Sequence, residues 1–138
     1  MMARRFIQLK NLADLDEIFR LCTPDVEVYG TKGFDAAKAA LADFYRSHPL
    51  LTHEVRESDM TVLGLGKVGY RFTKSWLDPD DGSRKTWVSY DGGRSKMETV
   101  EFAPDGRIRR VAVEEYDPAN SPFDADTAAA VAAGEGQG

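Results

Sequence analysis

The chain has 138 residues, of which 42% are hydrophobic and 30% are charged, and its net charge at pH 7 is −5. This length and balance predict one globular domain with a core of its own. The negative charge argues against a protein that binds nucleic acid through phosphate contacts. The single cysteine, Cys22, excludes an internal disulfide framework and has the helical phase of a small buried residue.

The sequence also carries no signal for a membrane or a secretory pathway. Its first residues are too polar and too short for a signal peptide. No apolar run approaches the roughly 20 residues that a membrane span requires. We therefore expect a cytoplasmic protein without a membrane or nucleic-acid partner.

The N-terminal region predicts two helices followed by a short strand. Apolar residues recur with helical spacing between residues 3 and 11. Asp14 is placed to cap a second helix, and Glu17 three residues later completes a pattern that resembles a capping box. Val26 and Val28 alternate with a polar residue, as in a half-buried strand.

A third helix is predicted over residues 34–48, where apolar residues share one side and Pro49 ends the pattern. The chain after Pro49 has the alternation of strands. The Asp-Gly-Gly sequence at 91–93 predicts a bulge or a small excursion. The predicted strands cover residues 53–65, 67–77, 84–102 and 107–116.

Helices followed by a long β-meander predict an α+β fold, with the helices packed on a curved antiparallel sheet that encloses one cavity. We expect this domain over residues 1–117. Residues 118–138 form a tail rich in Ala, Gly and Pro, in which residues 124–133 favour a short helix.

The order of these elements is similar to that of the nuclear transport factor 2-like superfamily, which includes ketosteroid isomerase, scytalone dehydratase and polyketide cyclases. The resemblance implies a cone-shaped, cystatin-like fold. The segments that carry it are MARRFIQL at 2–9, DLDEIFRLCTPDVEVYG at 14–30, GFDAAKAALADFYR at 33–46 and VEFAPDGRIRRV at 100–111.

The resemblance to ketosteroid isomerase does not extend to its chemistry. Phe6 stands where the isomerase has its tyrosine, and Gly30 stands where it has its carboxylate base. Glu98 matches the carboxylic acid that an apolar site keeps neutral as a hydrogen-bond donor. These replacements argue against a steroid isomerase mechanism.

The dehydratase branch of the superfamily implies a different set of catalytic residues, a histidine paired with an aspartate. That branch uses a histidine at the start of the strand after the third helix, and His53 matches this position. It pairs the histidine with an aspartate, for which the matching position is Asn11, with Asp14 one turn further on. A histidine titrates near neutral pH and therefore suits proton abstraction.

The residue pattern leaves alternatives open for these side chains. His53 is a candidate base or a strand-end histidine that is either exposed or packed on a neighbour. Glu98 is in phase with Val100 and Phe102, so it is either an acid in the cavity or half of a structural ion pair. Arg71 lies opposite the aromatic face and would bind an anionic substrate or face a partner chain.

The sheet is rich in aromatic residues, and we expect most of them in the core or an interface and some of them in a pocket for a flat apolar ligand. Two separated histidines and one cysteine do not make a metal site. We expect substrate contacts from Phe6, Tyr29, Phe44, Trp87, Val100, Val111, Val113 and Glu115.

Two functional hypotheses follow. The first is a cofactor-independent lyase, isomerase or cyclase acting on a small apolar substrate, including polycyclic or aromatic ones. His53 would be its general base, Glu98 a neutral donor or second acid, and Asn11 or Asp14 would orient the histidine. The second is a non-catalytic binding or assembly module of the same fold. Both are compatible with a homodimer through the outer sheet face, where an exposed Arg71 would suit a polar interface.

Overall fold

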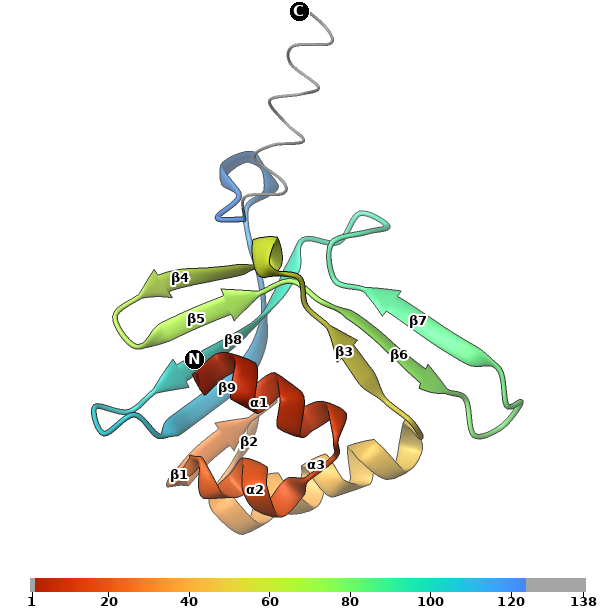
Figure 1. Cartoon of the computed structure of the whole chain (residues 1–138), viewed down its shortest axis with the longest axis horizontal. Coiled ribbons are helices and arrows are strands. Elements are labelled where there is room, and N and C mark those ends of the chain that lie inside the picture. Colours follow the sequence, from red (N-terminus) through yellow and green to blue (C-terminus); the bar gives the residue numbers. More distant parts are fainter. Residues whose placement is uncertain (1, 124–138) are drawn as a thin grey trace, which may run out of the picture.

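The computed structural model describes residues 2–123, which form three α-helices and two β-sheets (Figure 1). The helices are α1 (Met2–Asn11), α2 (Leu15–Arg20) and α3 (Phe34–Ser47). The strands are β1 (Cys22–Val28), β2 (Thr31–Lys32), β3 (Thr52–Glu54), β4 (Met60–Gly64), β5 (Lys67–Tyr70), β6 (Thr73–Leu77), β7 (Arg84–Val88), β8 (Lys96–Phe102) and β9 (Ile108–Glu115). No helix within residues 2–123 has the length and apolar composition needed to cross a bilayer.

The helices begin and end close to where the sequence predicts. Asp14 is the N-cap of α2, and its carboxylate accepts a hydrogen bond from the Glu17 backbone N–H at 3.3 Å. The Glu17 side chain instead pairs with Arg20 at 2.7 Å, so the predicted capping box is only half formed. Ala37 and Leu41 are the buried residues of α3.

The larger sheet has the strand order β2-β1-β9-β8-β5-β4, and the smaller one has the order β3-β6-β7. Neither sheet is closed. The expected α+β class is confirmed, with helices and a large sheet in one fold. The sheet differs from the expected antiparallel one in two details, because a second, three-stranded sheet is present and β1 runs parallel to β9. In Figure 1 the two sheets diverge from a shared apex, with the helices on their inner side.

The division into two sheets occurs where the sequence predicts continuous strands. The strand predicted at 67–77 is interrupted at Arg71, and the one predicted at 53–65 is interrupted by the 3₁₀-helix η1 (Glu57–Asp59). Arg71 is 1% exposed, and its Nη2 lies 2.7 Å from Asp59 Oδ1. A buried charge requires such a partner. The prediction that Arg71 lies on an exposed outer face is wrong, and the homodimer remains a prediction.

Of the two alternatives predicted for residues 91–93 within the segment 84–102, the structure has the excursion, because β7 ends at Val88 and β8 begins at Lys96. The main core lies between the helices and the larger sheet. A second, smaller cluster joins Phe123 to Tyr116, with ring centroids 4.9 Å apart. The helix predicted at 124–133 lies outside the described residues.

Candidate active site

A pocket of about 230 Å³ lies between α3 and strands of both sheets. Most of its wall is apolar, with a small number of polar groups, as in ligand-binding pockets generally. Its lining residues are Tyr29, Phe44, His53, Phe72, Lys74, Glu98 and Val113.

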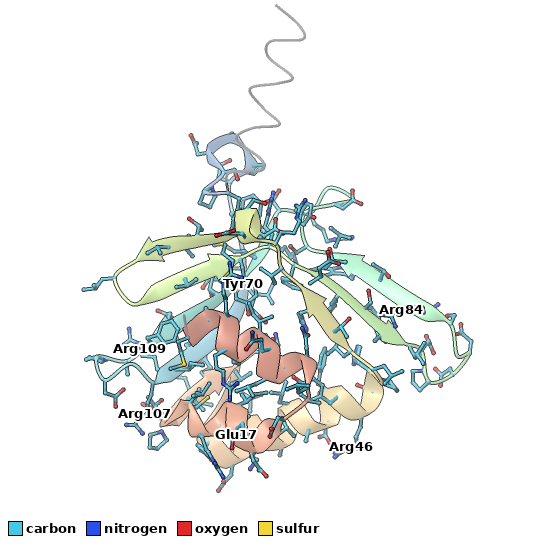
Figure 2. All side chains as sticks on the ribbon, in the orientation of Figure 1. Glu17, Arg46, Tyr70, Arg84, Arg107 and Arg109 are labelled. Atoms are coloured by element: carbon cyan, nitrogen blue, oxygen red, sulfur yellow. The ribbon has the colours of Figure 1, made fainter. Side chains whose placement is uncertain are left out.

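The register of the larger sheet places Glu98 of β8 between Tyr70 of β5 and Val113 of β9. Residues directly opposite each other in antiparallel strands share a face and have Cβ atoms about 4.5–5.5 Å apart. Tyr70 therefore lies beside the Glu98 carboxylate, in the interior of the fold. In Figure 2 Tyr70 lies in the interior of the fold, whereas Arg84, Arg107 and Arg109 lie at its periphery and are exposed.

Glu98 is the centre of a buried polar cluster. Its Oε1 and Oε2 atoms lie 3.0 and 2.8 Å from Nζ of Lys10, which belongs to α1. The Tyr29 hydroxyl also donates to Oε1, and the Tyr70 hydroxyl donates to Oε2. Lys10 in turn donates to the Tyr29 hydroxyl at 2.9 Å. A carboxylate has about four acceptor sites, so these contacts use the full capacity of Glu98.

This environment keeps Glu98 ionised. Burial alone would raise the pKa of the Glu98 carboxyl, but the Lys10 ammonium and the hydrogen-bond donors around it hold the pKa below its ordinary value. Burial and the Glu98 charge raise the pKa of Tyr29 and Tyr70 well above their usual range, so both hydroxyls stay protonated. Glu98 is therefore an anionic acceptor, which differs from the neutral donor or second acid expected from the sequence.

The backbone turn after β1 places Tyr29. Val28 pairs with Thr31, which leaves Tyr29 and Gly30 as the two central residues of a tight hairpin. Their φ angles are 49° and 87°, and two-residue hairpins that use positive φ at both positions favour glycine. Gly30 thus serves the turn that directs the Tyr29 hydroxyl inward, although Tyr29 as a whole is 40% exposed.

The smaller sheet brings His53 and Lys74 together, because His53 of β3 lies directly opposite Lys74 of β6. Trp87 of β7 is the next residue in this row. The three side chains share one face of the sheet. His53 and Lys74 line the pocket, and Trp87 packs against Phe72 at 5.4 Å between ring centroids.

His53 is a neutral imidazole. It is 7% exposed, and its Nε2 lies 3.4 Å from Lys10 Nζ. Burial and the positive charge of Lys10 lower the pKa of His53 to about 3. Its Nδ1 is buried and has no hydrogen-bond partner among residues 2–123.

The position of Lys10 also favours one tautomer of His53. The Lys10 ammonium has only donors, so Nε2 of His53 must act as the acceptor in this contact. The ring proton is then on Nδ1. An unpaired buried N–H of this kind is uncommon in proteins and suggests a functional role.

The two residues expected to orient the histidine have different positions. The Asn11 side chain holds the His53 backbone, with Oδ1 accepting from the backbone N–H at 2.6 Å and Nδ2 donating to the carbonyl at 3.0 Å. Asn11 therefore fixes β3 rather than the imidazole ring. Asp14 caps α2, and its carboxylate has no hydrogen bond to His53.

The expected substrate contacts lie in four different places. Tyr29, Phe44 and Val113 line the pocket. Phe6, Val100 and Val111 belong to the packed core. Trp87 lies beside the pocket in contact with Phe72, and Glu115 is exposed at the end of β9.

Three residues of the site, Lys10, Tyr70 and Lys74, are not among those predicted from the sequence. Lys10 lies four residues after Phe6 on the apolar side of α1, and Lys74 alternates in phase with Phe72. A charged residue in apolar phase was the signal that identified Glu98. The same signal, applied to lysines, would have found Lys10 and Lys74.

No family model matches the sequence, and no curated protein matches it. Solved structures do share its fold. SalBIII, an epoxide hydrolase/cyclase-like enzyme described for pyran ring formation in salinomycin, matches with a TM-score of 0.64 and 14% identity, over 83% of this chain and 87% of its own.

Two further solved structures share the fold of this chain. A protein of unknown function from Exiguobacterium sp. 255-15, described as nuclear transport factor 2-like, has a TM-score of 0.67 and 16% identity, over 85% of this chain and 99% of its own. A candidate polyketide cyclase from Sinorhizobium meliloti has a TM-score of 0.59 and 21% identity, over 79% and 89% of the two chains. At these identities the likeness establishes the fold alone.

Proposed function

We propose that this chain, which has the nuclear transport factor 2-like fold, is an acid–base enzyme of the lyase, isomerase or cyclase type. Its substrate would be a small, largely apolar carbonyl compound. The observation that carries this proposal is the meeting of a neutral His53 and an ionised Glu98 in one pocket.

His53 supplies the hydrogen bond to the substrate oxygen. Isomerisation, elimination and aldol-type cyclisation all develop negative charge on a carbonyl oxygen. A neutral imidazole carries its proton on Nδ1, which is buried in this structure, so the proposed complex requires a small movement of the ring or of a neighbouring side chain to present this N–H to the substrate oxygen. The Lys10 ammonium at Nε2 reinforces the donation. A pKa of about 3 makes His53 a weak base, so this role replaces the general base expected from the sequence. In the proposed step, water or hydroxide from solvent accepts the α-proton, while the enolate oxygen that forms is stabilised by the hydrogen bond from His53.

Glu98 positions the other groups instead of transferring a proton. Its four acceptor sites are occupied by Lys10, Tyr29 and Tyr70. The carboxylate thereby fixes Lys10 next to His53. Such preorganised donors stabilise a transition state without reorganisation, and loss of one donor costs about 10²–10³ in rate.

The pocket size restricts the substrate. Its volume of about 230 Å³ is below the roughly 300–1,000 Å³ typical of pockets for drug-sized ligands. This favours a substrate with one or two rings over a steroid-sized one. Phe44 and Phe72 provide flat apolar walls for such a molecule.

A non-catalytic binding module remains the second candidate on this fold. It would need only an apolar pocket, without polar groups at its base. The buried cluster around Glu98 and the unpaired Nδ1 of His53 favour catalysis instead. The similarity to SalBIII and to a candidate polyketide cyclase supports this by analogy of fold.

Deuterium exchange tests the proposal without knowledge of the natural substrate. A panel of small cyclic and aryl ketones is incubated with the protein in D₂O, and loss of the α-proton signal is followed by proton NMR. We expect the protein to accelerate exchange in at least one ketone, and His53→Ala to slow it by about 10²–10³. His48→Gln is the matched control, since His48 does not line the pocket. Equal rates for the wild type and His53→Ala would contradict the proposal.

A further inference from the structure

The hydrogen bonds of the pocket leave one charged group without a polar partner. Lys10, Glu98 and Tyr29 satisfy one another. Lys74 is half-buried and lines the same pocket. Among residues 2–123, no carboxylate lies within ion-pair distance of its Nζ, and no side-chain oxygen accepts from it.

Aromatic rings surround Lys74 instead. Its Nζ lies 4.9 Å from the ring centroid of Trp87, 5.6 Å from that of Trp76 and 5.7 Å from that of Phe44. Aromatic faces attract a cation within about 6 Å. They hold the ammonium in place but use none of its three N–H donors.

The charges around the pocket do not cancel at Lys74. Lys10 and Glu98 form a neutral pair, with Nζ 2.8 Å from Oε2. His53 is neutral and lies opposite Lys74 across β3 and β6. From β7 and α3, Lys74 is faced by Trp87 and Phe44, which carry no charge. The pocket therefore presents one uncompensated positive charge.

We propose that Lys74 binds a carboxylate on the substrate, so that this pocket takes small aromatic or unsaturated keto acids. Opposite residues in an antiparallel pair have Cβ atoms about 4.5–5.5 Å apart. One small molecule can therefore reach both side chains, with its carboxylate at Lys74 and its carbonyl oxygen at His53. The apolar rest of the substrate then lies against Phe44 and Phe72.

This inference rests on the proposed function for the role of His53, but carboxylate binding needs no turnover. Benzoate and benzamide are suitable probes, because they have nearly the same shape and differ in charge. Their affinities are measured by calorimetry at low salt. We expect benzoate to bind the wild type roughly tenfold more tightly than benzamide, or better.

Variants of Lys74 locate the source of this preference. Lys74→Met keeps the length of the side chain and should bring the ratio of the two affinities close to one. Lys74→Arg keeps the charge and should retain much of the preference. Lys85→Met is the matched control, since Lys85 lies in the neighbouring strand, is 43% exposed and pairs with Asp81 at 3.6 Å.

Each result supports or overturns the inference. Equal affinities in the wild type, no saturable benzoate binding, or a preference that survives Lys74→Met would overturn it. If ketone exchange is absent but the benzoate preference depends on Lys74, the pocket binds carboxylates and the proposed chemistry is wrong. If exchange depends on His53 but the preference is absent, the proposed function stands and Lys74 has another role.

Discussion

Within residues 2–123, two ion pairs have both partners buried, and they look alike in isolation. Lys10 and Glu98 are 2% and 1% exposed in one pair, and Arg71 and Asp59 are 1% and 2% exposed in the other. Both acids have pKa values held below the ordinary range, in spite of burial, by their cationic neighbours. The two pairs differ in their position in the fold. Glu98 of the first pair lines a pocket, whereas the second pair lies where β5 passes into β6.

The second pair explains the shape of the fold. Asp59 accepts from Arg71 and also from the Arg56 side chain at 3.0 Å, and Tyr90 stacks 4.4 Å from the Arg71 guanidinium. These contacts hold the chain at the point where the two sheets separate. Burial and charge alone therefore do not identify a functional site, whereas burial beside a pocket does.

The largest expected effect comes from breaking the first pair. Glu98→Gln leaves the Lys10 charge buried without a counterion, which costs about 3–5 kcal/mol of stability. The variant should also lose most ketone exchange activity, because Lys10 no longer stays next to His53. Urea unfolding and the NMR exchange assay measure the two effects.

A double variant separates the effect on stability from the effect on exchange activity. Lys10→Met combined with Glu98→Gln removes both charges, and neutral replacements of buried pairs are often close to neutral in stability. We expect the double variant to regain most of the lost stability while exchange stays slow. Recovery of both properties would show that the pair is structural only.

Breaking the second pair should affect stability alone. Asp59→Asn removes the carboxylate that lies 2.7 Å from the buried Arg71 guanidinium, and breaking a buried ion pair in this way should cost about 3–5 kcal/mol in urea unfolding. Below its transition, the folded variant should keep the wild-type exchange rate and the benzoate preference. A loss of exchange in fully folded Asp59→Asn would remove the distinction between the two pairs.

The stability of the fold should depend on pH through His53, whose pKa is lowered by burial and by Lys10 of the first pair. The folded pKa of His53 is lowered to about 3 from its ordinary value of 6.5. The unfolded chain therefore binds this proton first as the pH falls, so stability decreases below about pH 6.5 and continues to fall toward pH 3. We expect a loss of about 2 kcal/mol between pH 7 and pH 5, absent from His53→Phe when both are unfolded in urea.

The smallest effect is expected at Asn11, which reaches the first pair only through the backbone of β3. Asn11→Ala removes two hydrogen bonds to His53 and should cost about 1–2 kcal/mol of stability. Exchange should slow less than in His53→Ala, because the imidazole remains present. A rate as low as that of His53→Ala would give Asn11 a direct part in the chemistry.

The helices and the strand segments could be predicted because their signals are local. The caps, turn residues and periodicity of α1, α2 and α3 depend on residues a few positions apart. The acid at Glu98 was identified for the same reason, since it lies in phase with Val100. The strand breaks at residues 71–72 and 55–59 could not be predicted, because the contact of Arg71 with Asp59 depends on how two strands pair.

The sequence by itself determined the α+β order of elements and that Glu98 would be a buried acid. Only the tertiary structure decided what that acid does. Lys10 and Glu98 are 88 residues apart in the chain, and no local pattern specifies their contact. The pKa of a buried group depends on the charges packed around it, so the ionised Glu98 and the neutral His53 follow from the packing of α1 against the two sheets.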